Sequence, residues 1–347
     1  MPLIVFTILA QDGLANGLVY SLLAVSILLV FLVTRVLWVA AGDLVILSSF
    51  TLATATRGDV PGTVWITGLL ALAVLIANAA KHLLHGKEDT RWGEHILAAA
   101  VSAVAVLAAI FLVPLNPPLI VNVLITLALM LPIAYALYRL AFQPTYSASP
   151  LMLLFVAVAI HYAFIGTTLL LFGPDGYRIP PYFPGRLSAF SVSISYQVLF
   201  IVFLTIVVIL SLWLFFSRSI LGKVLTATAV NRRGAQLVGI SPMRGGVVAF
   251  VISGLMCTIS GILIAPTTTL YYDSGFIISL KGFIGVVLGG MASFPLAAIG
   301  ALGVGFVEAF SAFYTSTYRD VIVFGLLIPI LLWRASMLGA HHDEDVH

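Results

Sequence analysis

Long apolar segments with almost no charge recur along the whole chain, and they restrict what it can fold into. Segments of about 17 to 25 apolar residues are long enough to cross a bilayer as helices. No water is available in the hydrocarbon core, so each segment must satisfy its own backbone groups, and a helix does so. We place such segments at Gly13–Val33, Val36–Thr56, Gly62–Ala80, Ile96–Val113, Leu119–Leu140, Leu151–Phe172, Tyr196–Phe216 and Gly246–Leu270.

Further segments near the C-terminal end are shorter or interrupted. Phe276–Ala292 is rich in glycine and contains Lys281, Leu296–Phe313 contains Glu308, and Val321–Trp333 is too short to span unless it starts near Tyr318. The sequence therefore predicts an all-α polytopic membrane protein with about eleven transmembrane or broken helices. We expect residues 1–347 to form a single transmembrane domain.

The composition supports an integral membrane protein and argues against other classes. Only 8% of the 347 residues are charged, against roughly 25% in ordinary soluble domains. The apolar segments are continuous rather than alternating, which favours helices over an outer-membrane barrel. The net charge is +3, yet no basic, aromatic-rich surface for nucleic acid is present. Cys257 is the only cysteine, so neither a disulfide nor a cysteine-rich metal site is expected.

Basic residues between the segments predict the orientation in the membrane. Lys and Arg near span ends are retained on the cytoplasmic side, so we place the basic segment Arg218–Gly245 inside. Alternation of the segments then puts eleven of the 16 basic residues inside, namely Arg35, Lys81, Lys87, Arg91, Arg139, Arg218, Lys223, Arg232, Arg233, Arg244 and Arg334. The outer side receives Arg57, Arg178, Arg186, Lys281 and Arg319. This arrangement leaves the N-terminus outside and the C-terminus inside.

The sequence contains no recognisable motif for ATP hydrolysis or for catalysis at a metal. A GxxxxGK[ST] phosphate loop is missing, and Gly222-Lys223 is followed by Val and Leu rather than by the hydroxyl that would hold magnesium. The histidines of His82–His95 lack the helical spacing of four that is typical of metal ligands. We expect no catalytic residue, no cofactor and no metal site.

Ionisable residues within apolar segments are candidates for a translocation path. Such residues are costly in the membrane and are kept for transport or for pairing. Asp43, His161 and Glu308 are the candidates in this chain. Each has an alternative structural interpretation, because polar contacts between helices also stabilise membrane bundles.

The region Gly282–Gly305 combines seven glycines with Pro295 near its middle. Glycine permits close backbone approach and proline interrupts a helix. One interpretation is two short or half-helices that meet at Ala292–Pro295, with Gly289, Gly290 and Pro295 beside a translocation path. The other is tight helix packing through small residues.

The segment Arg218–Gly245 is the long polar interruption in the second half of the chain. Ala227–Val238 is compatible with a short amphipathic helix that ends at Gly239, and Pro242 follows soon after. Such a helix on the cytoplasmic face can dock into another protein, or it can lie on the lipid surface.

Four stretches resemble the LivH-type permease subunits of branched-chain amino acid ABC importers, in the same order and spacing. These are LANGLVYSLLAVSILLVFLVTRVLWVAAGD, LGKVLTATAVNRRGAQLVGIS, FVISGLMCTISGILIAP, and KGFIGVVLGGMASFPLAAIGALGVGFVEAFSAFY followed by YRDVIVFGLLIPILLW. The resemblance implies a multi-pass permease domain of the bacterial inner membrane. It also implies ABC ATPase subunits, a second permease that is LivM-like or identical, and a periplasmic solute-binding protein as partners.

The same resemblance implies that Gly222–Ile240 is the cytoplasmic coupling helix that docks into the ATPase. The residues that we assign to ATPase coupling are Ala227, Ala229, Asn231, Arg232, Arg233, Gln236 and Gly239.

This chain departs from the family pattern at several positions. Trp38–Asp43 replaces an Asn-Phe-Ala-His-Gly-Glu-like run, Gln143–Tyr146 replaces Arg-Pro-x-Arg, Ala159 replaces a glycine, and Thr226 stands where arginine is frequent. Residues 62–113 supply two further spans that shorter family members lack. These departures bear on the solute more than on the class of protein.

Two other classes compete with an ABC permease. A self-sufficient, ion-coupled secondary transporter would use Asp43, His161 and Glu308 as its coupling groups. A membrane enzyme would need polar catalytic groups clustered at one interface, and the sequence offers no such cluster.

Overall fold

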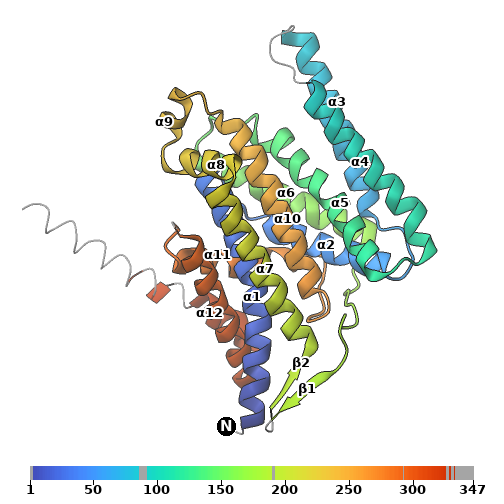
Figure 1. Cartoon of the computed structure of the whole chain (residues 1–347), viewed down its shortest axis with the longest axis vertical. Coiled ribbons are helices and arrows are strands. Elements are labelled where there is room, and N and C mark those ends of the chain that lie inside the picture. Colours follow the sequence, from blue (N-terminus) through green and yellow to red (C-terminus); the bar gives the residue numbers. More distant parts are fainter. Residues whose placement is uncertain are drawn as a thin grey trace, which may run out of the picture. The chain divides into compact units, whose positions relative to one another are not determined.

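The computed structural model describes residues 3–85, 92–189, 192–291, 293–325, 328–329 and 332. The chain divides into two compact units. The first unit contains residues 1–28, 182–207 and 280–347, and the second contains residues 29–181 and 208–279. Helices α1 (Leu3–Thr34), α7 (Tyr196–Arg218) and α11 (Gly275–Leu288) each contribute residues to both units (Figure 1).

The polytopic helical architecture is confirmed. Within the described residues, eight helices are long and apolar enough to cross a membrane. Besides α1 and α7 they are α3 (Thr63–His85), α4 (Trp92–Leu112), α5 (Leu119–Leu137), α6 (Pro150–Phe172), α10 (Pro242–Ile264) and α12 (Phe294–Tyr314). The last predicted segment, Val321–Trp333, lies partly outside the described residues, and α13 (Arg319–Gly325) covers its beginning.

Two predicted spans are too short to cross the membrane. Val36–Thr56 was expected to span, but α2 (Ala41–Ala55) has only 15 residues. The reason is that residues 36–40 form a turn before the helix, in which Val39 N donates to the Leu37 carbonyl and Ala41 N donates to the Trp38 carbonyl. The other is α11, with 14 residues. Every residue of α2 except Thr54 is nevertheless buried, so α2 is a core element of the second unit.

Small residues bring α2, α5 and α10 into close contact in the second unit. A Cβ atom on Gly261 of α10 would collide with Ser48 Oγ and the Val45 carbonyl of α2. A Cβ on Gly254 would collide with the Ala134 side chain of α5. Glycine at these positions lets the backbones approach, which is how membrane helices gain packing energy when lipid is as apolar as the protein.

Four aromatic side chains pack together beside helices α2, α5 and α10. The Trp38 and Phe250 rings lie 4.9 Å apart between centroids, and Phe142 lies 5.0 Å from Phe250. Tyr138 lies 5.1 Å from Phe250. All four side chains are buried, so the segment that links α1 to α2 is held against α5 and α10 through Trp38.

The described part of residues 62–113 contains α3 and α4, and these two helices pack with α5. Their shared core consists of Ala55, Val64, Ala105, Ala109, Val113, Ile125 and Leu129. The opposite faces expose large apolar side chains such as Leu69, Ile76, Leu97 and Val104. Apolar side chains on the outer face of a membrane helix are suited to contact with lipid.

Contacts between loops mark the two ends of the second unit. Arg232 Nε donates a hydrogen bond of 2.9 Å to the Tyr146 hydroxyl, and Tyr146 lies just before α6. Arg57 lies over the ring of Tyr177, 5.0 Å from its centroid, and Tyr177 follows α6. Since α6 runs for 23 residues, Arg232 and Arg57 lie at opposite ends of the unit.

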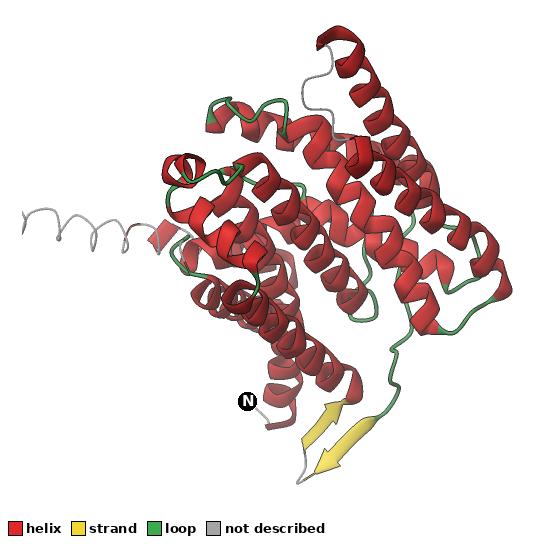
Figure 2. Cartoon of the chain, turned by 45° about the horizontal axis from the view of Figure 1, so that its top comes forward, coloured by secondary structure: helices red, strands yellow, loops and turns green. Residues whose placement is uncertain are grey.

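A β-hairpin in the first unit corrects the purely helical prediction. The Gly173–Tyr196 stretch contains antiparallel strands β1 (Arg186–Ala189) and β2 (Val192–Ser195), yellow in Figure 2. Their sequences, Arg-Leu-Ser-Ala and Val-Ser-Ile-Ser, alternate polar and apolar residues with the period of a strand. Gln11 of α1 donates to the Ser193 carbonyl at 2.7 Å and accepts from Ser195 N at 3.2 Å.

The glycine-rich stretch forms a helical hairpin of α11 and α12. Gly290 and Met291 adopt positive φ angles of 84° and 58° in the turn, and Pro295 lies in the first turn of α12. A half-helix is correct for α11 but wrong for α12, which has 21 residues and is long enough to span. The predicted meeting point includes Ala292, which lies outside the described residues.

Close packing explains the glycines of this hairpin. A Cβ on Gly289 would collide with the backbone N of Ala297, and a Cβ on Gly285 would collide with the Ala301 side chain.

Replacement of Gly289 by alanine should therefore destabilise the protein. Its Cβ would meet backbone atoms of Ala297 that cannot move aside, at a cost of about 1 to 3 kcal/mol. The matched control is Gly303→Ala in α12, where a Cβ would meet nothing within 4 Å. We expect a lower thermal unfolding temperature for Gly289→Ala in detergent and an unchanged or higher one for Gly303→Ala. Equal unfolding temperatures would contradict a tight contact at Gly289.

Candidate functional site: buried ion pairs and a surface helical segment

Asp43 and His161 form a buried pair in the second unit. Asp43 lies in the first turn of α2 and His161 lies in the middle of α6, 118 residues further along the chain. The distance between Asp43 Oδ2 and His161 Nδ1 is 2.8 Å. The two residues are 4% and 6% exposed, so each is the main polar partner that the other has within the apolar core.

The first turns of the two short helices meet directly beside this pair. Gly42 N of α2 donates to Ser279 Oγ of α11 at 3.3 Å. A Cβ on Gly42 would collide with the Gly275 carbonyl, and a Cβ on Gly275 would lie 3.0 Å from the Asp43 Cα. Helix N-termini carry positive partial charge and stabilise a nearby carboxylate. Asp43 therefore lies where two N-termini and an imidazole converge.

An aromatic ring packs against the imidazole of the pair. The centroid of Phe276, in the first turn of α11, lies 5.2 Å from that of His161. Short helices whose N-termini point at one place within the bilayer are the construction that binds anionic solute groups in transport proteins. This geometry can hold a carboxylate and can respond to a change in its partner.

A second cluster of buried charges lies in the first unit. Lys281 Nζ of α11 lies 2.7 Å from Glu308 Oε1 of α12 and 3.0 Å from Asp320 Oδ1 of α13. Arg319 Nε lies 3.5 Å from both Glu308 Oε1 and Asp320 Oδ1. Two basic and two acidic groups thus compensate each other. Lys281 and Glu308 are buried and need this compensation, whereas Arg319 and Asp320 are 44% and 35% exposed at the edge of the cluster.

Lys281, Arg319 and Asp320 are the members of this cluster that sequence reasoning did not name as candidates. Lys281 was placed in the segment Phe276–Ala292 and counted with the outer basic residues; it is only 3% exposed and belongs to α11. The signal was present, because an ionisable residue inside an apolar run is costly unless it is paired. The carboxylate that would pair with it could not be chosen from several acidic residues by sequence alone.

The predicted path residues occupy several places rather than one. Asp43 and His161 come together in the second unit. Glu308 belongs to the Lys281 cluster of the first unit. Gly289, Gly290 and Pro295 lie at the turn between α11 and α12, also in the first unit.

The predicted coupling segment consists of two helices rather than one. Helix α8 (Ile220–Val230) ends before Asn231, and α9 (Arg232–Leu237) begins after it. Asn231 adopts an extended φ of −146°, and its side chain accepts a hydrogen bond of 2.9 Å from Gly234 N. This cap starts a new helix, so the continuous helix over Ala227–Val238 was wrong. The predicted end is confirmed, since Gly239 follows with a φ of 81°.

Arg232 of α9 packs against Tyr146 in the connection before α6. The guanidinium of Arg232 stacks on the Tyr146 ring at 3.8 Å from its centroid, in addition to its hydrogen bond to the hydroxyl. Gln236 donates to the same hydroxyl at 3.4 Å. Both contacts tie α9 to the connection that precedes α6.

The other face of this segment is exposed and partly apolar. Val230, Leu237 and Val238 are 82%, 89% and 74% exposed. Arg233 is exposed beside them. Of the predicted coupling residues, Ala227, Asn231, Arg233, Gln236 and Gly239 are exposed, and Ala229 and Arg232 are half-buried.

A polytopic helical bundle with ionisable side chains buried among its apolar helices is the construction of a membrane transport protein. Residues 95–331 match the family described as branched-chain amino acid transport system / permease component. The chain belongs to this family of ABC permease components, so the resemblance to LivH-type permeases is confirmed.

Curated relatives agree with this assignment. The chain is 32% identical over 220 residues to the high-affinity branched-chain amino acid transport system permease protein BraD of Pseudomonas aeruginosa, covering 61% of this chain and 72% of that protein. It is 31% identical over 220 residues to the corresponding LivH protein of Escherichia coli strain K12, covering 61% and 71%. A chain of the solved PsaBC complex from Streptococcus pneumoniae aligns over 93% of this chain and 89% of its own, with 12% identity and a TM-score of 0.36.

Removal of one partner of the Lys281 pair should be more damaging than removal of both. Lys281→Met leaves Glu308 buried without its closest cation, which should lower the free energy of unfolding by about 3 to 5 kcal/mol. The double variant Lys281→Met/Glu308→Leu should recover part of that loss. Thermal unfolding of the purified single and double variants measures the coupling.

Arg319→Met provides the control, because its side chain is 44% exposed and exposed ion pairs contribute about 0 to 1 kcal/mol. Additive losses in the double variant would show that Lys281 and Glu308 do not stabilise each other.

Proposed function

We propose that this chain is the transmembrane subunit of an ABC importer in the bacterial inner membrane. It carries a branched-chain amino acid or a related small polar solute, as the names of its relatives suggest. ATPase subunits supply the energy in trans. The observation that carries the proposal is the α8–α9 segment, which exposes apolar side chains and Arg233 on one side while Arg232 anchors the other side to Tyr146.

The exposed side of α8–α9 fits a protein partner. An apolar patch rimmed by polar groups is typical of a binding surface. Val230, Leu237 and Val238 supply the apolar part, and Arg233 supplies the charge. We assign Ala227, Ala229, Asn231, Arg232, Arg233, Gln236 and Gly239 to this docking surface for the ATPase.

The positive charge of this segment supports the proposed orientation. Arg218–Gly245 carries five basic residues and no carboxylate, and basic loops are retained in the cytoplasm. Arg232 and Tyr146 therefore mark the cytoplasmic end of the second unit, and Arg57 and Tyr177 mark its outer end. This orientation leaves the N-terminus outside and the C-terminus inside.

The contacts give a physical route from the docking surface to the buried pair. Arg232 holds Tyr146, which lies four residues before the start of α6 at Pro150. His161 lies on α6 and contacts Asp43 on α2. Movement of α9 would shift the start of α6 and change the environment of the Asp43–His161 pair. A switch of this kind works when the partner binds two states of the permease with different affinity.

Three kinds of partner follow from this reading. ABC ATPases dock at α8–α9, a second permease, LivM-like or identical, completes the pore, and a periplasmic solute-binding protein delivers solute to the outer side. Membrane lipid surrounds the bundle, and nucleic acid has no role.

An ion-coupled secondary transporter is the competing function, since Asp43, His161 and Glu308 are ionisable and buried. The two classes differ in their source of energy. Solute uptake by proteoliposomes that contain the permease with or without its ATPase distinguishes the two classes.

Arg233→Glu should abolish attachment of the ATPase. Arg233 is exposed, so charge reversal there disturbs docking without disturbing the Arg232–Tyr146 contact. We expect loss of ATPase co-purification and of ATP-dependent uptake of leucine, isoleucine or valine. The matched control, Arg244→Glu, is an exposed arginine in the first turn of α10 and should retain both. Gradient-driven uptake without an ATPase would instead establish the secondary transporter.

Asp43→Asn should lower the uptake rate if the pair lines the path. The amide keeps the shape of the side chain but removes the charge that pairs with His161, and we expect a loss of at least tenfold, about 1.4 kcal/mol. Asp59→Asn is the control, because Asp59 is exposed in the turn after α2. Normal uptake by a stably folded Asp43→Asn protein would assign the pair a purely structural role.

A further inference from the structure

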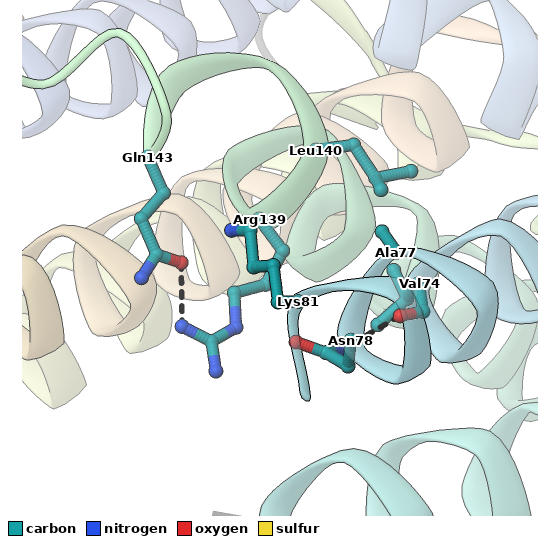
Figure 3. Close-up of a pocket in the computed structure, with 7 residues that line it drawn as sticks. All are labelled: Val74, Ala77, Asn78, Lys81, Arg139, Leu140 and Gln143. Atoms are coloured by element: carbon teal, nitrogen blue, oxygen red, sulfur yellow. Dashed lines mark hydrogen bonds between the residues drawn. The ribbon is translucent and has the colours of Figure 1, made fainter. Parts of the chain in front are cut away.

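A basic pocket lies at the end of the second unit that also carries the Arg232–Tyr146 contact. Figure 3 shows Lys81 of α3 and Arg139, which follows α5, extending into the same pocket. The described residues that line it are Val74, Ala77, Asn78, Lys81, Arg139, Leu140 and Gln143. None of them is acidic. The pocket is small, with a cavity volume of about 20 Å³.

Arg139 is held in place by neighbouring side chains. Its guanidinium donates to Gln143 Oε1 and contacts His95 Nε2. Because arginine keeps its proton, His95 Nε2 is the acceptor in that contact. The hydrogen of His95 then resides on Nδ1, which donates to the Tyr135 hydroxyl at 3.0 Å. These bonds orient the guanidinium before any ligand binds.

The pocket still has unused binding capacity. Each terminal nitrogen of the Arg139 guanidinium carries two hydrogens, and the contacts with Gln143 and His95 use one on each. The Lys81 side chain is exposed and supplies a second cation. Glu94, the residue before His95, is exposed and does not line the pocket. A half-buried, oriented guanidinium beside a lysine is suited to a phosphate group.

The surroundings of the pocket favour a lipid over a soluble anion. Lys81 and Arg139 lie at the ends of membrane-spanning segments, where lipid head groups are found. Leu69, Leu72 and Ile76 of α3 are 66%, 54% and 59% exposed. They lie on the face of α3 opposite to Val74, Ala77, Asn78 and Lys81, so they mark lipid contact around this helix but do not line the pocket. The cavity volume of about 20 Å³ is far below the roughly 300 to 1,000 Å³ of sites that enclose a whole small molecule, so a ligand can be held only at its mouth.

We propose that Lys81 and Arg139 form a binding site for the phosphate of an anionic glycerophospholipid. The lipid would bridge α3 and the end of α5, and so would fasten the α3–α4 pair to the part of the second unit that contains α5 and α6. Basic pockets between membrane helices bind anionic head groups through this combination of charge and depth.

Binding of phosphatidylglycerol to the purified full-length chain tests this site. We expect tighter binding of phosphatidylglycerol than of phosphatidylcholine, measured by native mass spectrometry and by titration with labelled lipid. Lys81→Gln should weaken phosphatidylglycerol binding about fivefold, the effect of one basic group near an anionic surface. Arg139→Gln should weaken it at least as much. Phosphatidylcholine binding should not change.

Lys81→Gln tests the site even if Arg139→Gln fails to fold, since Lys81 is exposed and its stem makes little packing contact. Lys223→Gln is the matched control, because it removes one exposed charge from α8 without touching the pocket. Wild-type phosphatidylglycerol affinity in both pocket variants would overturn the site. Inorganic phosphate binding that requires Lys81 and Arg139, without preference between the two lipids, would overturn the lipid and assign a soluble anion.

Discussion

The absence of water in the hydrocarbon core is the constraint on which the rest of this structure depends. A charge buried there must find a partner, because its desolvation costs several kcal/mol. Asp43 pairs with His161, and Lys281 pairs with Glu308. Asp43 lies on α2 and Lys281 lies on α11, two helices that are too short to cross the membrane alone. Their partners, His161 on α6 and Glu308 on α12, lie on helices long enough to span, so each buried pair ties a short helix to a spanning one.

Glycine determines how closely these short helices can approach. Gly42 and Gly275 leave no room for a side chain at the meeting point of α2 and α11. As a result, the N-terminus of one helix lies against the first turn of the other, and the positive ends of two helix dipoles converge near Asp43. Larger residues would separate the helices and leave Asp43 with His161 alone. The electrostatics of the site therefore follow from the packing rather than from additional charged residues.

Hydropathy predicted most of the membrane-spanning helices, since a long apolar run in a membrane protein has few alternatives to a helix. It also identified Asp43, His161 and Glu308, because ionisable residues in such runs are conspicuous. It could not pair Asp43 with His161, since 118 residues separate them and periodicity carries no information on tertiary contacts. Hydropathy also missed the break at Asn231, where a single side-chain cap outweighs a continuous helical pattern.

Two positions that depart from the family pattern explain how arginines gather at one end of the second unit. Gln143 and Tyr146 stand where the resemblance leads one to expect arginine. Gln143 accepts a hydrogen bond from Arg139, and Tyr146 accepts one from Arg232. An arginine at either position would offer no acceptor and would repel the guanidinium that now lies there. The neutral side chains therefore do not remove a basic site; they allow Arg139 to face the pocket with Lys81 and Arg232 to anchor α9. The basic groups at this end therefore lie on α3, just after α5 and on α9, and the acceptors of the two arginines lie in the connection before α6.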